Sequence, residues 1–211
     1  MKYYPVFLDI WGKKCVVAGG GEVAARKVGR LLDCGAKVLV VSPQLTPELT
    51  ALKAEGAIEH FAAEYNIQYM EGAVLIIGAT DDEKTNAVIS SDARNLGIPV
   101  NIVDDPQKCD FILPSLVERG DLTFAIGTGG KSPALARYLR EELESVYGNE
   151  YAILLKVLGQ LRGKMEKNTG KGRVWFDELL AEGLLEAIRE NDTGRVKKII
   201  RDITGEEVHI D

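Results

Sequence analysis

The sequence predicts an α/β fold with a doubly wound parallel sheet, followed by a small strand-and-helix region and a C-terminal helical region. Short apolar runs alternate with helix-like segments through the first 113 residues, which is the pattern of parallel strands joined by crossover helices. A glycine-rich turn, Gly19–Gly21, joins the first apolar run to the first helix. Beyond residue 113 a strand pair and then helices follow, so we expect domains at 1–113, 114–150 and 151–211.

Composition and charge exclude several classes of protein. The 211 residues are 45% apolar, enough for a core, and the net charge of −6 argues against nonspecific binding to nucleic acid or to an anionic membrane. No apolar run is long enough to span a bilayer, and the first residues do not form a signal peptide. Because the three cysteines are scattered and histidines number only two, we expect a cytoplasmic protein without a structural zinc or a resident metal site.

The first strand, turn and helix carry a dinucleotide-binding pattern. An apolar run over 15–18 precedes Gly19, Gly21 and Ala24, which fit G-x-G-x-x-G/A. The first glycine permits the tight turn, the second lets a pyrophosphate approach the backbone, and the alanine lets the helix pack on the sheet. A purely structural turn is the alternative. The residues expected to contact the cofactor here are Gly19, Gly20, Gly21, Glu22, Val23 and Ala24.

The end of the second strand departs from the usual dehydrogenase pattern. A helix over 23–34 and a strand over 37–41 complete a right-handed βαβ unit. Dehydrogenases commonly carry an acid after this strand to bind the ribose hydroxyls, but this chain has Ser42, Pro43 and Gln44. Two interpretations stay open: a relaxed choice between NAD and NADP, or ribose contacts made by Ser42 and the backbone.

Later strands end in polar residues at the same edge of the sheet. Strands are expected at 58–61, 73–78 and 99–103, and helices at 46–52, 65–69 and 83–96. Cofactors lie at the carboxyl ends of strands in open α/β sheets. The residues expected near the cofactor at these ends are Ala79, Thr80, Asp81, Asn101 and Val103. Either Asp81 or Asp82 is expected to cap the following helix.

The sequence after residue 113 predicts two strands followed by helices. The strands are expected at 115–118 and 122–126, and the helices at 134–147, 151–165, 175–190 and 193–203, with a break at 168–172. Ser132 is the expected cap of the first of these helices. Its leucines Leu135, Leu139 and Leu143 form one stripe, which indicates a core or an interface.

Five motifs occur in order along the chain. They are VVAGGGEVAARK at 16–27, ATDD at 79–82, NIVD at 101–104, FILPS at 111–115 and GGKSPALAR at 129–137. In this order and spacing they resemble the precorrin-2 dehydrogenase family, the dehydrogenase and ferrochelatase module of siroheme synthases. The resemblance covers the chain from residue 4 to about residue 165 and is weaker in the terminal helices.

The resemblance implies a reaction, a cofactor and an assembly. The reaction is the NAD-dependent oxidation of precorrin-2, a tetrapyrrole, to sirohydrochlorin, followed in some members by Fe²⁺ insertion. The assembly is a homodimer built on the region 114–150. The family's catalytic aspartate falls on Asp104, which would take a proton while NAD takes a hydride. The alternative is that Asp104 or Asp105 caps the turn before Pro106.

The implied substrate carries many carboxylates although the chain is acidic, so local cations are needed to bind it. Arg137 and Arg140 are candidates, and a solvated charge on a helix face is the alternative for each. Backbone N–H groups after Gly127 offer further donors. The residues expected to bind substrate are Ser115, Arg119, Thr128, Gly129, Gly130, Lys131 and Arg137.

Two other functions stay open at this point. A NAD-sensing module without catalysis would share the glycine turn but would need neither Asp104 nor the segment 129–137. A chelatase without dehydrogenase activity would not need the intact glycine turn.

Overall fold

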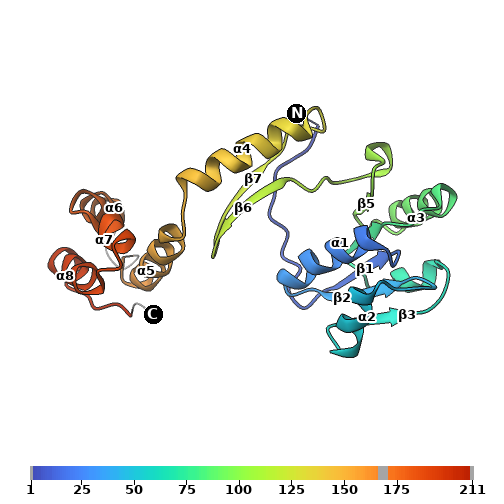
Figure 1. The fold of residues 1–211 in the computed structure, drawn as a ribbon, viewed down its shortest axis with the longest axis horizontal. Coiled ribbons are helices and arrows are strands. Elements are labelled where there is room, and N and C mark those ends of the chain that lie inside the picture. Colours follow the sequence, from blue (N-terminus) through green and yellow to red (C-terminus); the bar gives the residue numbers. More distant parts are fainter. Residues whose placement is uncertain (1, 166–170, 210–211) are drawn as a thin grey trace. The chain divides into compact units, whose positions relative to one another are not determined.

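A computed structural model describes residues 2–165 and 171–209 of the chain (Figure 1). The chain divides into two compact units, Met1–Leu113 and Pro114–Asp211. The further boundary at residue 150 stays a prediction.

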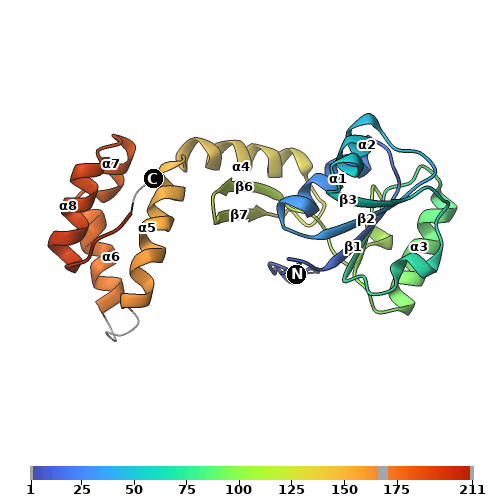
Figure 2. The ribbon, with the colours of Figure 1, turned by 90° about the horizontal axis from the view of Figure 1, so that it is seen from below.

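The first unit is a five-stranded parallel sheet with helices on both faces (Figure 2). Its elements are β1 (Lys14–Ala18), α1 (Glu22–Asp33), β2 (Lys37–Val41), α2 (Pro47–Ala54), β3 (Ile58–Phe61), η1 (Ile67–Met70), β4 (Leu75–Gly78), α3 (Glu83–Asn95), β5 (Val100–Ile102) and η2 (Pro106–Lys108). The strand order is β3-β2-β1-β4-β5, so the chain runs outward from β1 in one direction and from β4 in the other. The point of reversal, between β1 and β4, is where open α/β sheets bind their ligands.

Side-chain alternation along the strands divides the core into two layers. Cys15 and Val17 of β1 pack with α1 and α2 on one face, whereas Val16 and Ala18 pack with α3 and η1 on the other. All four side chains are fully buried. Strands covered on both faces are expected to be continuously apolar, which is why the run 15–18 has no polar residue.

The described residues of the second unit, 114–165 and 171–209, form an antiparallel strand pair and five helices. Its elements are β6 (Ser115–Arg119), β7 (Leu122–Ile126), α4 (Pro133–Val146), α5 (Glu150–Met165), α6 (Lys171–Ala181), α7 (Leu184–Arg189) and α8 (Thr193–Thr204). The strands β6 and β7 pair in register from Ser115 with Ile126 to Arg119 with Leu122. A core shared by the last four helices includes the buried residues Leu154, Leu161, Leu184 and Ile200.

The structure confirms the predicted fold class and differs from the predicted helices at two places in the second unit. The sequence predicts one helix over 175–190, but α6 ends at Ala181 and α7 begins at Leu184. Gly183 separates them at φ 80°, a left-handed conformation that stops a helix. Of the predicted break at 168–172, residues 168–170 lie outside the described residues, whereas Lys171 and Gly172 belong to α6, so the break does not extend to them. No helix in the described part of the chain is long and apolar enough to cross a membrane.

Candidate functional site

Four loops meet at the carboxyl edge of the sheet, because all five strands run parallel. They follow β1, β2, β4 and β5. The cofactor residues predicted in the first unit lie in these loops or in the first turn of α1, except Asn101, which lies within β5. Backbone hydrogen bonds tie neighbouring loops together. Gly19 N–H donates to Val41 O (2.9 Å), and Ala79 N–H donates to Ala18 O (2.8 Å). The predicted convergence of these loops is therefore present.

The three glycines of the first loop differ in what a side chain would contact at each position. Gly19 has φ 127°, and a Cβ there would lie 2.2 Å from Ala79 O. A Cβ on Gly20 would lie 1.9 Å from Gln44 O, so this glycine lets two loops touch. A Cβ on Gly21 would have no atom of the described residues within 4 Å. Only Gly21 faces open space, which is the position where a pyrophosphate needs close access to the backbone.

The start of α1 is open to an anion. Gly21 is its N-cap residue and supplies no side-chain hydrogen bond. The small residue Ala24 is fully buried against the sheet, as the fingerprint requires. Uncapped N–H groups and the positive end of the helix dipole favour a phosphate at this point.

The loop after β2 is fixed by a histidine that the sequence did not single out. His60 Nε2 lies 2.9 Å from Ser42 O, and its Nδ1 lies 3.2 Å from the Lys53 ammonium. Because an ammonium only donates, Nδ1 is the acceptor and Nε2 carries the proton given to Ser42 O. The Ser42 hydroxyl donates to Gln44 O (2.8 Å). This hydroxyl therefore shapes the loop expected at the ribose, and its lone pairs still accept.

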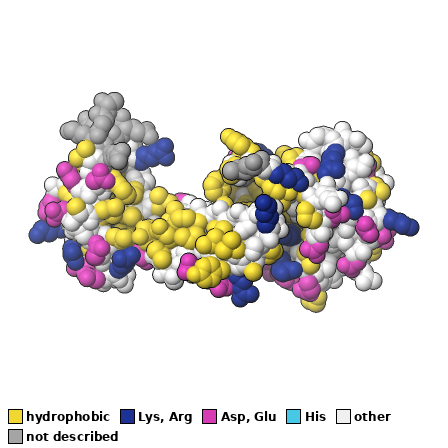
Figure 3. Space-filling model, turned by 90° about the horizontal axis from the view of Figure 1, so that it is seen from above, with side chains coloured by type: hydrophobic (Ala, Val, Ile, Leu, Met, Phe, Trp, Pro, Cys, Tyr) yellow, Lys and Arg dark blue, Asp and Glu magenta, His cyan; other side chains and the backbone are white. Residues whose placement is uncertain are grey.

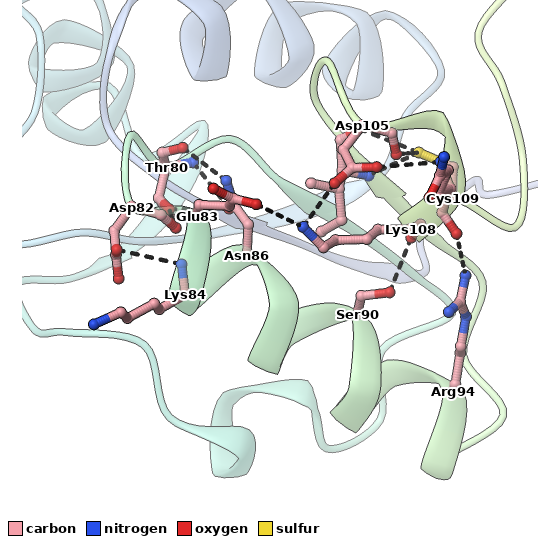
Figure 4. Close-up of polar contacts among 12 residues, drawn as sticks. Thr80, Asp82, Glu83, Lys84, Asn86, Ser90, Arg94, Asp105, Lys108 and Cys109 are labelled. Carbon is pink, nitrogen blue, oxygen red and sulfur yellow. Dashed lines mark hydrogen bonds and ion pairs between the residues drawn. The ribbon is translucent and has the colours of Figure 1, made fainter.

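The loop after β4 is held by Asn86, the second residue that sequence reasoning missed (Figure 4). The Asn86 side chain is buried; it donates to Thr80 O (2.8 Å) and accepts from the Thr80 hydroxyl (2.9 Å). Asp82 caps α3 by accepting from the backbone N–H groups of Lys84 and Thr85, as predicted for one of the two aspartates. The other, Asp81, is left exposed at the edge of the sheet.

Asp104 lies in a strained turn directly after β5. Its φ of 61° is one of two positive values among the described non-glycine residues. Asp105 N–H donates to Ile102 O (3.3 Å), which closes the turn and puts Asp104 at its third position. Glycine or asparagine usually occupies such a position, so strain at a non-glycine residue marks a candidate functional site.

Asp105, the residue after Asp104, caps the turn before Pro106. The sequence left this capping role open between the two aspartates. Asp105 accepts from Gln107 N–H to cap η2 and pairs with Lys108 at 2.7 Å, and Lys108 holds the pKa of Asp105 below its usual value. Asp104 makes neither contact and is exposed. Its charge acts on Lys27 of α1: burial lowers the pKa of the Lys27 ammonium, and the Asp104 carboxylate opposes that change. The cap is thus Asp105.

A cavity of about 280 Å³ opens between the ends of β4 and β5. Three of the predicted residues line it, namely Asp81, Val103 and Asp104. Its other polar lining residues are Glu83, Asn86, Asp105 and Lys108. Asn101 is placed differently: its buried side chain donates to Phe111 O at 3.0 Å, so it is engaged with the following segment.

The predicted substrate residues lie in the second unit, several of them with partners there. Arg119 donates to Tyr147 O (2.7 Å) and Glu144 O (3.2 Å), carbonyls at the end of α4. Arg137 pairs with Glu141 at 2.8 Å. Arg119 thus caps a helix, and Arg137 matches the helix-face alternative; their roles toward a substrate stay predictions.

The segment before α4 is an ordered turn. The Thr128 hydroxyl donates to Ser132 O (3.1 Å) and accepts from Ser132 N–H (3.3 Å). Ser132 caps α4 as predicted, by accepting from Leu135 N–H. Gly129 and Gly130 both have positive φ and are exposed, as is Lys131. Ser115, the first residue of β6, is half-buried.

His60 and Asn86, the two residues that sequence reasoning missed, share one property. Each hydrogen-bonds to backbone atoms that only the tertiary fold brings close to it. One signal existed for Asn86, because a polar residue stands where the core-facing stripe of α3, with Ile89 and Ala93, calls for an apolar one. No local signal marks His60, whose partner Ser42 lies in the loop after a different strand, β2.

The chain is similar to known proteins over both units. A family model described as putative NAD(P)-binding matches residues 6–115. The chain belongs to this family. A second model, sirohaem biosynthesis protein central, matches residues 119–145 of this NAD(P)-binding protein.

Individual relatives agree with both models. Siroheme synthase 1 of Aeromonas salmonicida (strain A449) is 38% identical over 98% of this NAD(P)-binding chain and 45% of that protein. The siroheme synthase of Methylobacillus flagellatus is 41% identical over 88% of this chain and 40% of that protein. The solved structure of "SirC, precorrin-2 dehydrogenase" has a TM-score of 0.73 and 26% identity, covering 97% of this chain and 100% of the other.

These matches confirm the resemblance drawn from the five motifs. The chain spans less than half the length of the siroheme synthases it matches, but it corresponds to the whole of the SirC chain.

Proposed function

We propose that this chain oxidises precorrin-2 to sirohydrochlorin with NAD⁺ as the hydride acceptor. The observation that carries the proposal is the meeting of the Gly19–Gly21 turn and the Asp104 turn at one edge of one parallel sheet. The match to a precorrin-2 dehydrogenase over 97% of the chain supports the choice of substrate. A NAD-sensing module is not favoured, because it gives no reason for a strained, exposed carboxylate beside the cofactor edge.

The residues at this edge fit NAD. The open space before Gly21 and the uncapped start of α1 suit the pyrophosphate. The loop Ser42–Gln44, held by His60, suits the adenosine ribose, and the loop 79–81 suits the nicotinamide half. When bound, the nicotinamide ring supplies the hydride acceptor, while the protein orients it and excludes water.

Asp104 is proposed as the general base. Oxidation removes a hydride and a proton from the tetrapyrrole, so a base must accept the proton as the hydride leaves. The Asp104 carboxylate is exposed, lines the 280 Å³ cavity and is not used as a cap.

We also propose that two copies of the chain associate through α4. Leu135, Tyr138 and Val146 of α4 are 49%, 55% and 58% exposed, and apolar side chains gather along this helix in Figure 3. A two-stranded sheet such as β6–β7 is marginally stable by itself. A second copy of the chain packed on this unit would stabilise it by burying exposed apolar surface. The exposed Lys131 beside this helix is proposed to bind a carboxylate of the substrate.

We place the activity in the cytoplasm. Cys15, Cys34 and Cys109 are all unpaired, which fits a reducing compartment.

The test is an anaerobic assay with purified protein, precorrin-2 and NAD⁺, followed by the absorbance of NADH and sirohydrochlorin. The Asp104→Asn variant is the decisive comparison, because asparagine tolerates the left-handed backbone but cannot act as a base. Asp33→Asn, at the far end of α1, is the matched control. Loss of a general base lowers the rate by about 100- to 10,000-fold.

The wild-type and Asp33→Asn proteins are expected to form NADH at the same rate, and Asp104→Asn at the much lower rate. NAD⁺ binding without any product from the wild type would replace the proposal by the sensing module. Fe²⁺ added after the oxidation tests the metal insertion that the resemblance implies; Fe²⁺ is then a substrate.

A further inference from the structure

Cys109 lies where the free edge of the sheet meets the turn that carries Asp104. Because β5 is the last strand, the N–H groups on its outer side have no strand partner. Ile102 N–H donates instead to Cys109 Sγ at 3.1 Å. The next residue also hydrogen-bonds to the outer edge of β5, because Asp110 N–H donates to Val100 O at 2.8 Å. Cys109 therefore replaces a strand at this position.

The same sulfur contacts both ends of the turn. Cys109 Sγ lies 3.1 Å from Ile102 O and 3.2 Å from Asp105 O, the residues on either side of Val103 and Asp104 (Figure 4). A thiol has one proton, so it donates to one of these carbonyls at a time. The side chain is only 9% exposed, and burial raises the pKa of the thiol, which keeps that proton in place.

The turn needs such support because its central residue is strained. A non-glycine residue in the left-handed region persists only where its surroundings hold it. Other contacts fix the far part of the loop: Ser90 donates to Lys108 O at 2.9 Å, and Arg94 donates to Gln107 O at 3.2 Å. Among the residues that the structure describes, Cys109 is the side chain that hydrogen-bonds the backbone on both sides of Asp104.

We propose that Cys109 is a positioning residue for Asp104, which holds the left-handed turn so that the carboxylate stays in the cavity. The proposal rests on the proposed role of Asp104 as the base. Three hydrogen bonds to the backbone distinguish Cys109 from Cys15 in β1. Cys15 is fully buried in the same unit, and its thiol makes no hydrogen bond to any residue that the structure describes.

The experiment compares Cys109→Ala with two controls. Cys15→Ala removes the same atom from the other core layer of the same unit without touching the turn. Cys109→Ser restores a small group that both donates and accepts. For each protein, amide hydrogen exchange at Ile102 and Asp105, the Kd of NAD⁺, and kcat for precorrin-2 oxidation are measured.

For Cys109→Ala we expect at least tenfold faster exchange at both amides, an unchanged Kd, and kcat lower by about 10- to 100-fold, the effect of misplacing a catalytic group. Cys109→Ser should recover most of both losses, and Cys15→Ala should keep kcat and the exchange at these two amides. Unchanged exchange in Cys109→Ala overturns the proposal, as does an unchanged kcat. If the wild type makes no product, the proposed function has failed, and the exchange alone then decides whether Cys109 holds the turn.

Discussion

The left-handed backbone of Asp104 reverses the usual ranking of glycine and alanine. At an ordinary helical position glycine is less stable than alanine by about 1 kcal/mol. At φ 61° the Cβ atom is the source of strain, so Asp104→Gly should give a more stable protein than Asp104→Ala. Both variants lack the carboxylate, so the pair separates backbone strain from chemistry.

The expected difference follows from two opposing terms. A left-handed conformation costs an L-residue about 1–2 kcal/mol, which glycine avoids. Glycine also makes the unfolded chain more flexible, which costs about 0.4–1 kcal/mol. The net free energy of unfolding should favour Asp104→Gly over Asp104→Ala by about 1 kcal/mol.

The assay is urea unfolding of the first unit. The chain has two tryptophans, Trp11 in the first unit and Trp175 in the second. In a Trp175→Phe background the fluorescence reports Trp11 alone, and the Trp11 ring packs on the Gly35 backbone, so unfolding removes that contact. Arg26→Gly and Arg26→Ala on the exposed side of α1 are the control pair, for which alanine should be the more stable by about 1 kcal/mol.

If Asp104→Ala is as stable as Asp104→Gly while the Arg26 pair differs as expected, residue 104 does not hold a left-handed backbone in solution. The argument from strain to function then fails. If Asp104→Gly still oxidises precorrin-2 at the wild-type rate, the carboxylate is not the base.

Three further outcomes follow from the site. Gly21→Ala should fold normally but raise the Kd of NAD⁺, measured by titration, at least tenfold. Gly20→Ala should lower the melting temperature, because the added Cβ meets another loop at residue 20 but not at residue 21. Equal melting temperatures of the two variants would contradict this. Asn86→Leu should cost about 1–3 kcal/mol of unfolding free energy and raise the KM of NAD⁺, since it leaves polar atoms of Thr80 without partners; an unchanged KM would mean that this loop does not contact the cofactor. Hydrogen bonds from the helix that it caps hold the pKa of Asp82 below its ordinary 3.8, so its stabilisation is present above that pH and is lost as pH falls through the lower value; Asp82→Asn should lose less stability than the wild type when unfolding is measured from pH 5 downward.

The carboxyl edge of the sheet was predictable because its signals are local. Apolar runs mark the strands, Gly19–Gly21 marks the turn, and parallel strands necessarily place their carboxyl ends together. The choice between Asp104 and Asp105 as cap was not predictable, since two adjacent acids before a proline look alike in sequence. The hydrogen bond from Gln107 N–H to Asp105 and the pairing of Asp105 with Lys108 separate them.

The contacts that fix the loops could not be read from the sequence. His60 and Cys109 act on backbone atoms of other segments, and a hydrogen bond to a carbonyl leaves no pattern of residue types. The same holds for Arg119, whose charge suggests a ligand until the end of α4 is seen beside it. The helix over 175–190 was mispredicted because one glycine in a helical pattern is often tolerated, whereas Gly183 has a left-handed φ.

The covered edge of β5 has a consequence for evolution and for solubility. An open strand edge invites pairing with another chain and so promotes aggregation. Here the segment around Cys109 and Asp110 occupies that edge. An insertion or deletion between 103 and 109 would shift this cover out of register and expose the strand. The length of this loop is therefore constrained by protection against aggregation, independently of any selection on catalysis, and its length should drift less among folded variants than its exposed residues do.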